Sequence, residues 1–128
     1  MNIPQDLKYT QDHEWVRIEG DEATVGITDF AQGELGDIVY VEVETIGESL
    51  DKEAVFGTVE AVKTVSDLFL PLTGEITAFN EDLEDTPELV NDDPYDQGWI
   101  IKMKISDLSQ LEALLTHEGY QAVISEFK

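Results

Sequence analysis

The feature that most constrains the fold is a single lysine, Lys63, between two apolar runs that both have the pattern of β-strands. Residues 54–62 alternate as an extended chain and carry few polar side chains on either face. This pattern is typical of a buried strand. After a short polar turn, residues 68–70 resume an apolar run that ends in turn-forming residues. We therefore predict a lysine hairpin within residues 54–79, with Lys63 at or near its tip.

A lysine at the tip of a hairpin has two interpretations. In the first, it is a solubilising charge on a turn, which the spacing alone favours. In the second, its amine is acylated, which removes the charge and extends the reach of the side chain. At a rigid hairpin tip, such an amine is accessible to a modifying enzyme.

The residues around Lys63 resemble the attachment hairpin of the glycine cleavage system H proteins. The similar segments are Val59-Glu60-Ala61-Val62-Lys63, Ser66-Asp67, Pro71 and Gly74-Glu75. Biotin carriers are less similar, because they place methionine on both sides of the lysine. Lipoyl domains of the 2-oxoacid dehydrogenases usually have an acidic residue where Val62 stands. The resemblance extends over nearly the whole chain, through His13-Glu14-Trp15, Gly26-Ile27-Thr28-Asp29, Leu35-Gly36-Asp37, Pro87-Glu88-Leu89-Val90-Asn91, Pro94-Tyr95 and Gly98-Trp99.

The resemblance implies that Lys63 carries covalent lipoate and that the protein is a carrier without catalytic activity of its own. Glu60, Ser66 and Asp67 would then form the context that a lipoate-attaching enzyme reads. Glu14 would help to shelter the lipoyl-lysine arm when it carries a methylamine group. The loaded arm ends in an ammonium, which a partly buried carboxylate can recognise.

The implied function is to shuttle the methylamine group of glycine on the lipoyl-lysine arm. The implied partners are a pyridoxal-phosphate glycine decarboxylase, a folate-dependent aminomethyltransferase and dihydrolipoamide dehydrogenase. One alternative is a lipoyl carrier that relays lipoyl groups or serves redox regulation. Another, from a different class, is an unmodified acidic adaptor.

The spacing of turns predicts a mainly β fold in one domain, residues 1–128. We expect a β-sandwich or flattened barrel of the lipoyl and biotinyl type. Residues 15–27 have the pattern of a hairpin, and Thr28 or Asp29 can cap a short helix that ends at Gly36. Helices within residues 107–127 should cover a sheet edge, with a capping box from Ser109 to Glu112, a helix end at Gly119 and His117 as a capping or surface residue.

Composition excludes several classes of function. The chain has 29 acidic and seven basic residues and a formal charge of −22, which repels nucleic acid and anionic membranes. Cysteine is absent, so disulfides, cysteine catalysis and thiolate metal sites are excluded. With only two histidines, the chain offers few candidates for the general base of a hydrolase. We also predict no metal site. We expect a monomer in the cytoplasm, or in mitochondria if a transit peptide has been removed.

Overall fold

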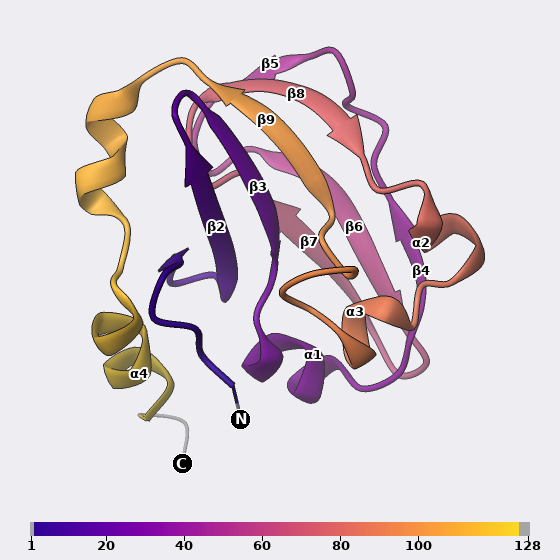
Figure 1. Ribbon diagram of the computed structural model, residues 1–128. Helices are drawn as coiled ribbons and strands as arrows, with labels where there is room; N and C mark the ends of the chain where they lie inside the picture. The colour runs from indigo at the N-terminus through magenta and orange to yellow at the C-terminus, as the bar shows by residue number, and fades with distance from the viewer. Residues whose placement is uncertain (1, 126–128) are drawn as a thin grey trace.

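The structure is a computed structural model that describes residues 2–125. Within these residues, nine antiparallel strands form two sheets (Figure 1). The larger sheet has the order β1 (Lys8–Tyr9), β2 (Glu14–Glu19), β3 (Glu22–Ile27), β9 (Ile101–Ile105), β8 (Gly74–Phe79), β5 (Ser49–Leu50). The smaller sheet has the order β4 (Ile38–Glu42), β6 (Val55–Ala61), β7 (Val65–Phe69). The predicted β-sandwich is confirmed, and within residues 2–125 the sheets do not close into a barrel.

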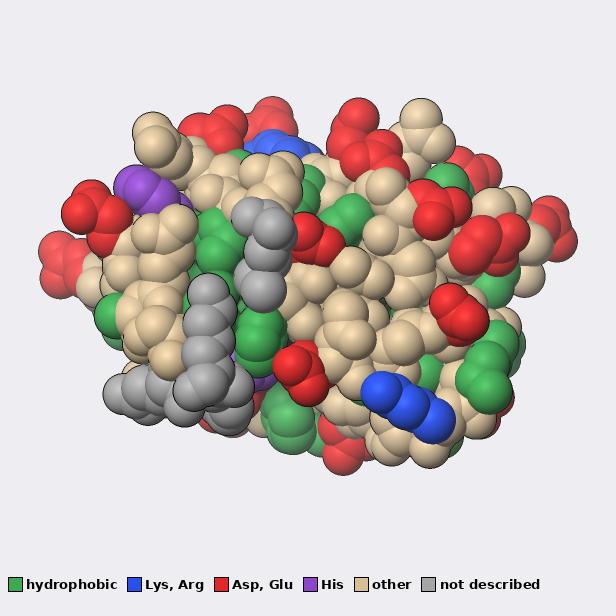
Figure 2. Space-filling model, turned by 90° about the horizontal axis from the view of Figure 1, so that it is seen from below, with side chains coloured by type: hydrophobic (Ala, Val, Ile, Leu, Met, Phe, Trp, Pro, Cys, Tyr) green, Lys and Arg blue, Asp and Glu red, His purple; other side chains and the backbone are tan. Residues whose placement is uncertain are grey.

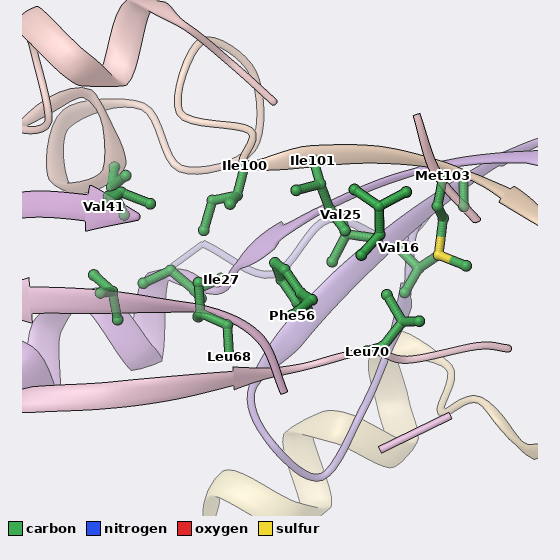
Figure 3. Packing of buried hydrophobic residues seen from close by; sticks show 14 of the residues in the cluster. Val16, Val25, Ile27, Val41, Phe56, Leu68, Leu70, Ile100, Ile101 and Met103 are labelled. Atoms are coloured by element: carbon green, nitrogen blue, oxygen red, sulfur yellow. The ribbon is translucent and has the colours of Figure 1, made fainter. Parts of the chain in front are cut away.

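The core lies between the two sheets. Val41 and Leu68 of the smaller sheet belong to the same buried cluster as Val25, Ile101 and Met103 of the larger sheet (Figure 3). Burial of such side chains supplies the main favourable free energy of folding. The core therefore fixes the hairpin of β6 and β7 to the rest of the molecule.

Strand β6 is buried on one face only, so the prediction of a strand buried on both faces was wrong. Val59 and Ala61 are buried, but Glu60 is exposed and Val55 keeps 44% of its surface accessible. A register shift between Val55 and Gly57 marks a β-bulge, which changes the alternation of faces along the strand. The lysine hairpin itself ends at Phe69, because β8 pairs in the larger sheet.

Helix α1 (Asp29–Leu35) begins and ends as its sequence predicts. The hydroxyl of Thr28 accepts a hydrogen bond from Ala31 N (3.2 Å). Gly36 has a φ of 83°, in the left-handed region that glycine adopts without strain. Two further short helices, α2 (Asp82–Asp85) and α3 (Leu89–Asp92), lie in the polar stretch between β8 and β9.

The C-terminal segment corrects two predictions. The 3-10 helix η1 (Leu108–Ala113) is capped by Asp107, whose carboxylate accepts from Ser109 N, so Ser109 is not the cap. Helix α4 (His117–Ser125) continues past Gly119, because Tyr120 and Ile124 are buried and hold its last turns in place. None of the helices within residues 2–125 is long and apolar enough to cross a membrane.

Helix α4 covers the β1 edge of the larger sheet, as predicted (Figure 1). The rings of Tyr9 and Tyr120 stack with their centroids 4.8 Å apart. Tyr9 also exchanges backbone hydrogen bonds with Leu115, just before the helix. The edge strand is thus paired and covered, which protects it from pairing with another chain. Residues 126 and 127, which we predicted to be helical, lie outside the described part of the chain.

Candidate functional site

Lys63 lies in the tight turn that joins β6 to β7. Glu60 pairs with Val65 across the hairpin, and Ala61 N donates to Thr64 O (2.7 Å) to close the turn. Lys63 is exposed, and Val62 beside it keeps 75% of its surface accessible. The predicted position of the lysine at the hairpin tip is confirmed.

The loop between α1 and β4 supports this tip. Val62 N donates to Asp37 O (3.0 Å), which ties the turn to the loop. The Lys63 stem runs alongside Gly36: its Cε would lie 3.5 Å from a Cβ placed there. Lys63 therefore begins from a fixed base although its amine is accessible.

Asn91 holds the supporting loop in place. Its Nδ2 donates to Gly36 O (2.9 Å) and to Gln32 Oε1 (2.9 Å), and its Oδ1 accepts from Ile38 N (2.9 Å). Asn91 thus links α3, α1 and β4 beneath the hairpin tip. Its role could not be inferred from spacing, because its partners lie more than 50 residues away in the sequence.

We expect Asn91→Ala to loosen the hairpin tip. The substitution leaves Gly36 O and Ile38 N without their side-chain partner and should lower the free energy of unfolding by about 1–3 kcal/mol. Denaturant unfolding measures this loss, and amide hydrogen exchange at Val62 should accelerate. Asn91→Asp, which keeps the acceptor for Ile38 N and loses the donor, should fall between the parent and Asn91→Ala. An unchanged rate of amide hydrogen exchange at Val62 in Asn91→Ala would show that the hydrogen bonds of Asn91 do not support the hairpin tip.

A cleft of about 260 Å³ runs beside the hairpin, between β7, α1 and the start of β2. Most of its wall is apolar. The lining residues are Asp12, His13, Glu14, Ile27, Phe30, Ala31, Glu34, Leu35, Val59, Ser66, Asp67 and Leu68. A cleft whose surface is mainly apolar and that also carries polar groups is a common form of a ligand site.

Glu14 is the buried carboxyl group of this cleft, with 2% of its surface exposed. Its Oε2 accepts from Phe69 N of the hairpin (2.8 Å) and its Oε1 accepts from Thr10 Oγ1 (3.4 Å). Burial raises the pKa of Glu14 well above its ordinary value, although the Phe69 N–H acts in the opposite direction. Glu14 is therefore not a solvated acid at a strand edge. Its carboxylate would gain a partner if a cation entered the cleft.

The raised pKa predicts how the unliganded protein responds to pH. Between the ordinary glutamate value and the raised one, the folded state keeps a proton at Glu14 that the unfolded state has lost. Stability contributed by this group is thus present at low pH and falls as pH rises through that window. Glu14→Gln keeps an acceptor for Phe69 N and removes the titration. We expect the variant to melt a few degrees higher than the parent at pH 7.

The measurement is thermal unfolding of both proteins across this pH range. Glu19→Gln is the matched control, because Glu19 is exposed at the far end of the same strand. It also corrects for the change in net charge. If the melting temperatures of the parent and of Glu14→Gln changed with pH in parallel, Glu14 would not be a buried carboxyl group that titrates in this range.

Helix α4 supports the other end of the cleft. The hydroxyl of Tyr120 lies 2.9 Å from His13 Nδ1 and 2.7 Å from Thr28 Oγ1. His13 has a φ of 67°, which is uncommon for a residue with a Cβ. His13 also contacts the Phe30 ring, with centroids 4.9 Å apart. This role of Tyr120 could not be predicted, because its place in the apolar stripe of the helix indicated packing only.

The structure separates the predicted site residues into two groups. Glu14, Ser66 and Asp67 line the cleft. Glu60 lies on the opposite face of the hairpin, where it is exposed. Asp67 pairs with Thr58, in phase with Glu60, so it borders the cleft while its side chain belongs to the exposed face. Trp15 is wholly buried and donates from its indole nitrogen to Pro94 O (2.8 Å), so it is a core residue. The cleft as a whole suits a slender apolar chain that ends in a cation.

Three comparisons with known proteins agree with one another. Residues 7–127 match the family described as glycine cleavage H-protein. A glycine cleavage system H protein of Bacteroides thetaiotaomicron is 62% identical over 125 residues, which is 98% of this chain and 99% of the relative. A glycine cleavage system H protein of Bacteroides fragilis is 58% identical over 125 residues, again 98% of this chain and 99% of the relative. The crystal structure of a Mycobacterium marinum H protein superposes with a TM-score of 0.83 at 36% identity, covering 97% of this chain and 98% of the other.

Proposed function

Because the chain belongs to the glycine cleavage H-protein family, we propose that Lys63 is the residue to which its lipoyl group is attached. As a member of that family the protein is a non-catalytic lipoyl carrier of the glycine cleavage system. The observation that carries the assignment is the position of Lys63. It is an exposed lysine on a supported hairpin tip, next to an apolar cleft that contains a buried carboxyl group.

The residues of the cleft fit a lipoyl arm. Ile27, Phe30 and Leu35 provide an apolar wall suited to an aliphatic chain. Glu14 provides a carboxyl group suited to the ammonium of a methylamine cargo. When bound, the lipoyl group supplies a dithiolane that accepts electrons and the cargo. The chain itself supplies position, a high effective concentration and exclusion of water.

The proposed cargo is the methylamine group of glycine. The partners that this implies are a glycine decarboxylase that loads the arm, an aminomethyltransferase that unloads it and a dihydrolipoamide dehydrogenase that reoxidises it. The charge of −22 supports encounters with basic surfaces on such partners. We propose that the protein acts as a monomer in the cytoplasm, or in mitochondria after removal of a transit peptide.

We propose that a lipoate-attaching enzyme recognises the hairpin through Glu60, Ser66 and Asp67. Their places differ: Glu60 is exposed on β6, before the turn, and Ser66 and Asp67 follow the turn along β7. An enzyme that contacts all three has to straddle the hairpin from the side of the edge strand β7.

Two measurements test the proposed function. The intact mass of protein from its native cell should show one lipoyl group, which an unmodified adaptor would lack. Exchange of labelled bicarbonate into glycine, reconstituted with a glycine decarboxylase, should depend on the lipoylated protein. A lipoylated protein that supports no exchange would favour the relay or redox-regulatory alternative.

A further inference from the structure

Exposed large apolar side chains concentrate on the sheet that carries Lys63. Seven such side chains are exposed in the described part of the chain, and five of them belong to the three-stranded sheet or its turn. The five are Val39, Tyr40, Val55, Val62 and Val65. Apolar side chains that gather on one exposed face often mark an interaction site.

Strand pairing brings two of these side chains, Tyr40 and Val65, into one row with Glu60 beside the hairpin tip. Tyr40 of β4 pairs with Glu60 of β6, which pairs with Val65 of β7, so the three side chains form one row on the same face. Tyr40 keeps 47% of its surface exposed and Val65 59%. Val62, next to Lys63, extends the patch to the turn. We call Tyr40, Glu60, Val62 and Val65, together with Glu42, the outer face.

The two faces of the hairpin differ in character. Val59 and Leu68, on the inner face, are buried and line the cleft. The outer face is open to solvent at Val62 and Val65. At its β4 side, where α2 contacts the strand, Tyr40 and Glu42 line a hollow with Glu84, and Tyr40 keeps about half of its surface exposed. Within residues 2–125, the cleft is lined by other residues than those of the outer face.

Acidic groups surround this apolar row. Glu60 lies within it, and Tyr40 OH donates to Glu42 Oε2 (3.3 Å). In the next row, Glu42 pairs with Thr58 and Thr58 with Asp67. Figure 2, which views the molecule from the lower end of Figure 1, shows acidic side chains spread over that end and few basic ones. A complementary partner therefore has an apolar centre with arginine or lysine at its rim.

We propose that the outer face is the docking surface for the enzyme that attaches lipoate to Lys63, a proposal that rests on the proposed function. In that step the deprotonated Nζ attacks the carbonyl carbon of an activated lipoate. An amide bond forms, the activating group leaves with its electron pair, and the amine releases a proton. The lysine stem has only four carbons, so the enzyme has to contact the surface next to the turn. Enzymes that meet the much longer finished arm are under no such constraint.

The test compares attachment with later use of the arm. Tyr40→Ser and Val65→Thr are made in the unlipoylated protein, and kcat/KM for lipoylation is measured by mass with a lipoate-attaching enzyme and an activated acyl donor. We expect a fall of about tenfold for Tyr40→Ser, as for truncation of a well-packed interface side chain. Tyr40→Phe, which keeps the ring, should stay near the parent. Leu108→Ser is the matched control, because Leu108 is 53% exposed on η1 and outside the smaller sheet.

The same variants, once lipoylated to completion, are assayed for glycine exchange. The proposal expects them to match the parent, and it expects added salt to slow lipoylation of the parent. Lipoylation of Tyr40→Ser and Val65→Thr at the parent rate would overturn it. A defect confined to glycine exchange would also overturn it, because the face would then dock another enzyme. Absence of lipoylation in the parent would instead refute the proposed function, so the two failures are distinguishable. Melting temperatures equal to the parent's show that a lipoylation defect is not a folding defect.

Discussion

We expect the replacement of Lys63 by arginine to abolish lipoylation and to reduce carrier activity to background, while the fold stays unchanged. The guanidinium of arginine stays protonated and has no nucleophilic amine to acylate, although it keeps the positive charge. Lys63 is exposed, and its turn is closed by backbone hydrogen bonds that do not involve the side chain. Intact mass after incubation with a lipoate-attaching enzyme measures the loss, and peptide mapping locates the group in the parent.

Lys52→Arg is the control for this prediction. Lys52 lies in the turn after β5, away from the hairpin tip, and should not be modified. A lipoyl group mapped to Lys52 or Lys8, or a mass increase that survives Lys63→Arg, would contradict the assignment of Lys63.

The parts of the site that the sequence predicted are those set by local pattern. The turn at Lys63 follows from the two extended runs that flank it. Helix α1 follows from a capping hydroxyl at Thr28 and a left-handed glycine at Gly36, seven residues of helix apart. In each case the residues that determine the structure are close together in the chain.

The cleft could not be predicted in this way, because its wall comes from distant segments. Residues of β2, β3, α1 and β7 meet there only after the two sheets pack. The hydrogen bond from Asn91 to Gly36 O likewise joins two distant segments of the chain. The β-bulge in β6 also depends on pairing, since residues 54–62 alone read as a strand that is apolar on both faces. Here tertiary contacts override the local pattern.

For Glu14, the sequence indicated a candidate residue, but only tertiary contacts determine its environment. Its sequence context left open a solvated acid at a strand edge, whereas the structure buries it against Phe69 N. A buried carboxyl group lowers the stability of the unliganded protein at neutral pH. Its presence is coherent if the cleft receives a cation that compensates for the cost. The hydrogen bond from Phe69 N fixes the carboxyl group to β7, which begins at the lysine turn.

We therefore expect Glu14→Gln to shorten the lifetime of the methylamine-loaded protein. A charge-assisted hydrogen bond to the cargo ammonium contributes about 1.5–3 kcal/mol, which corresponds to roughly a tenfold to hundredfold shift towards the sheltered arm. The glutamine keeps an acceptor for Phe69 N but removes the negative charge. Lipoylation should be unchanged, while ammonia and formaldehyde should be released about tenfold faster in the absence of partner enzymes.

Glu34→Gln separates a specific carboxylate from the general potential of an acidic molecule. Glu34 also lines the cleft but is exposed, so solvent screens its charge. If Glu14 acts by direct contact with the ammonium, only Glu14→Gln accelerates release, and added salt changes the parent rate little. Equal acceleration in both variants would assign the shelter to the overall negative field instead. Release from Glu14→Gln at the parent rate would show that the buried carboxyl group has no part in holding the arm.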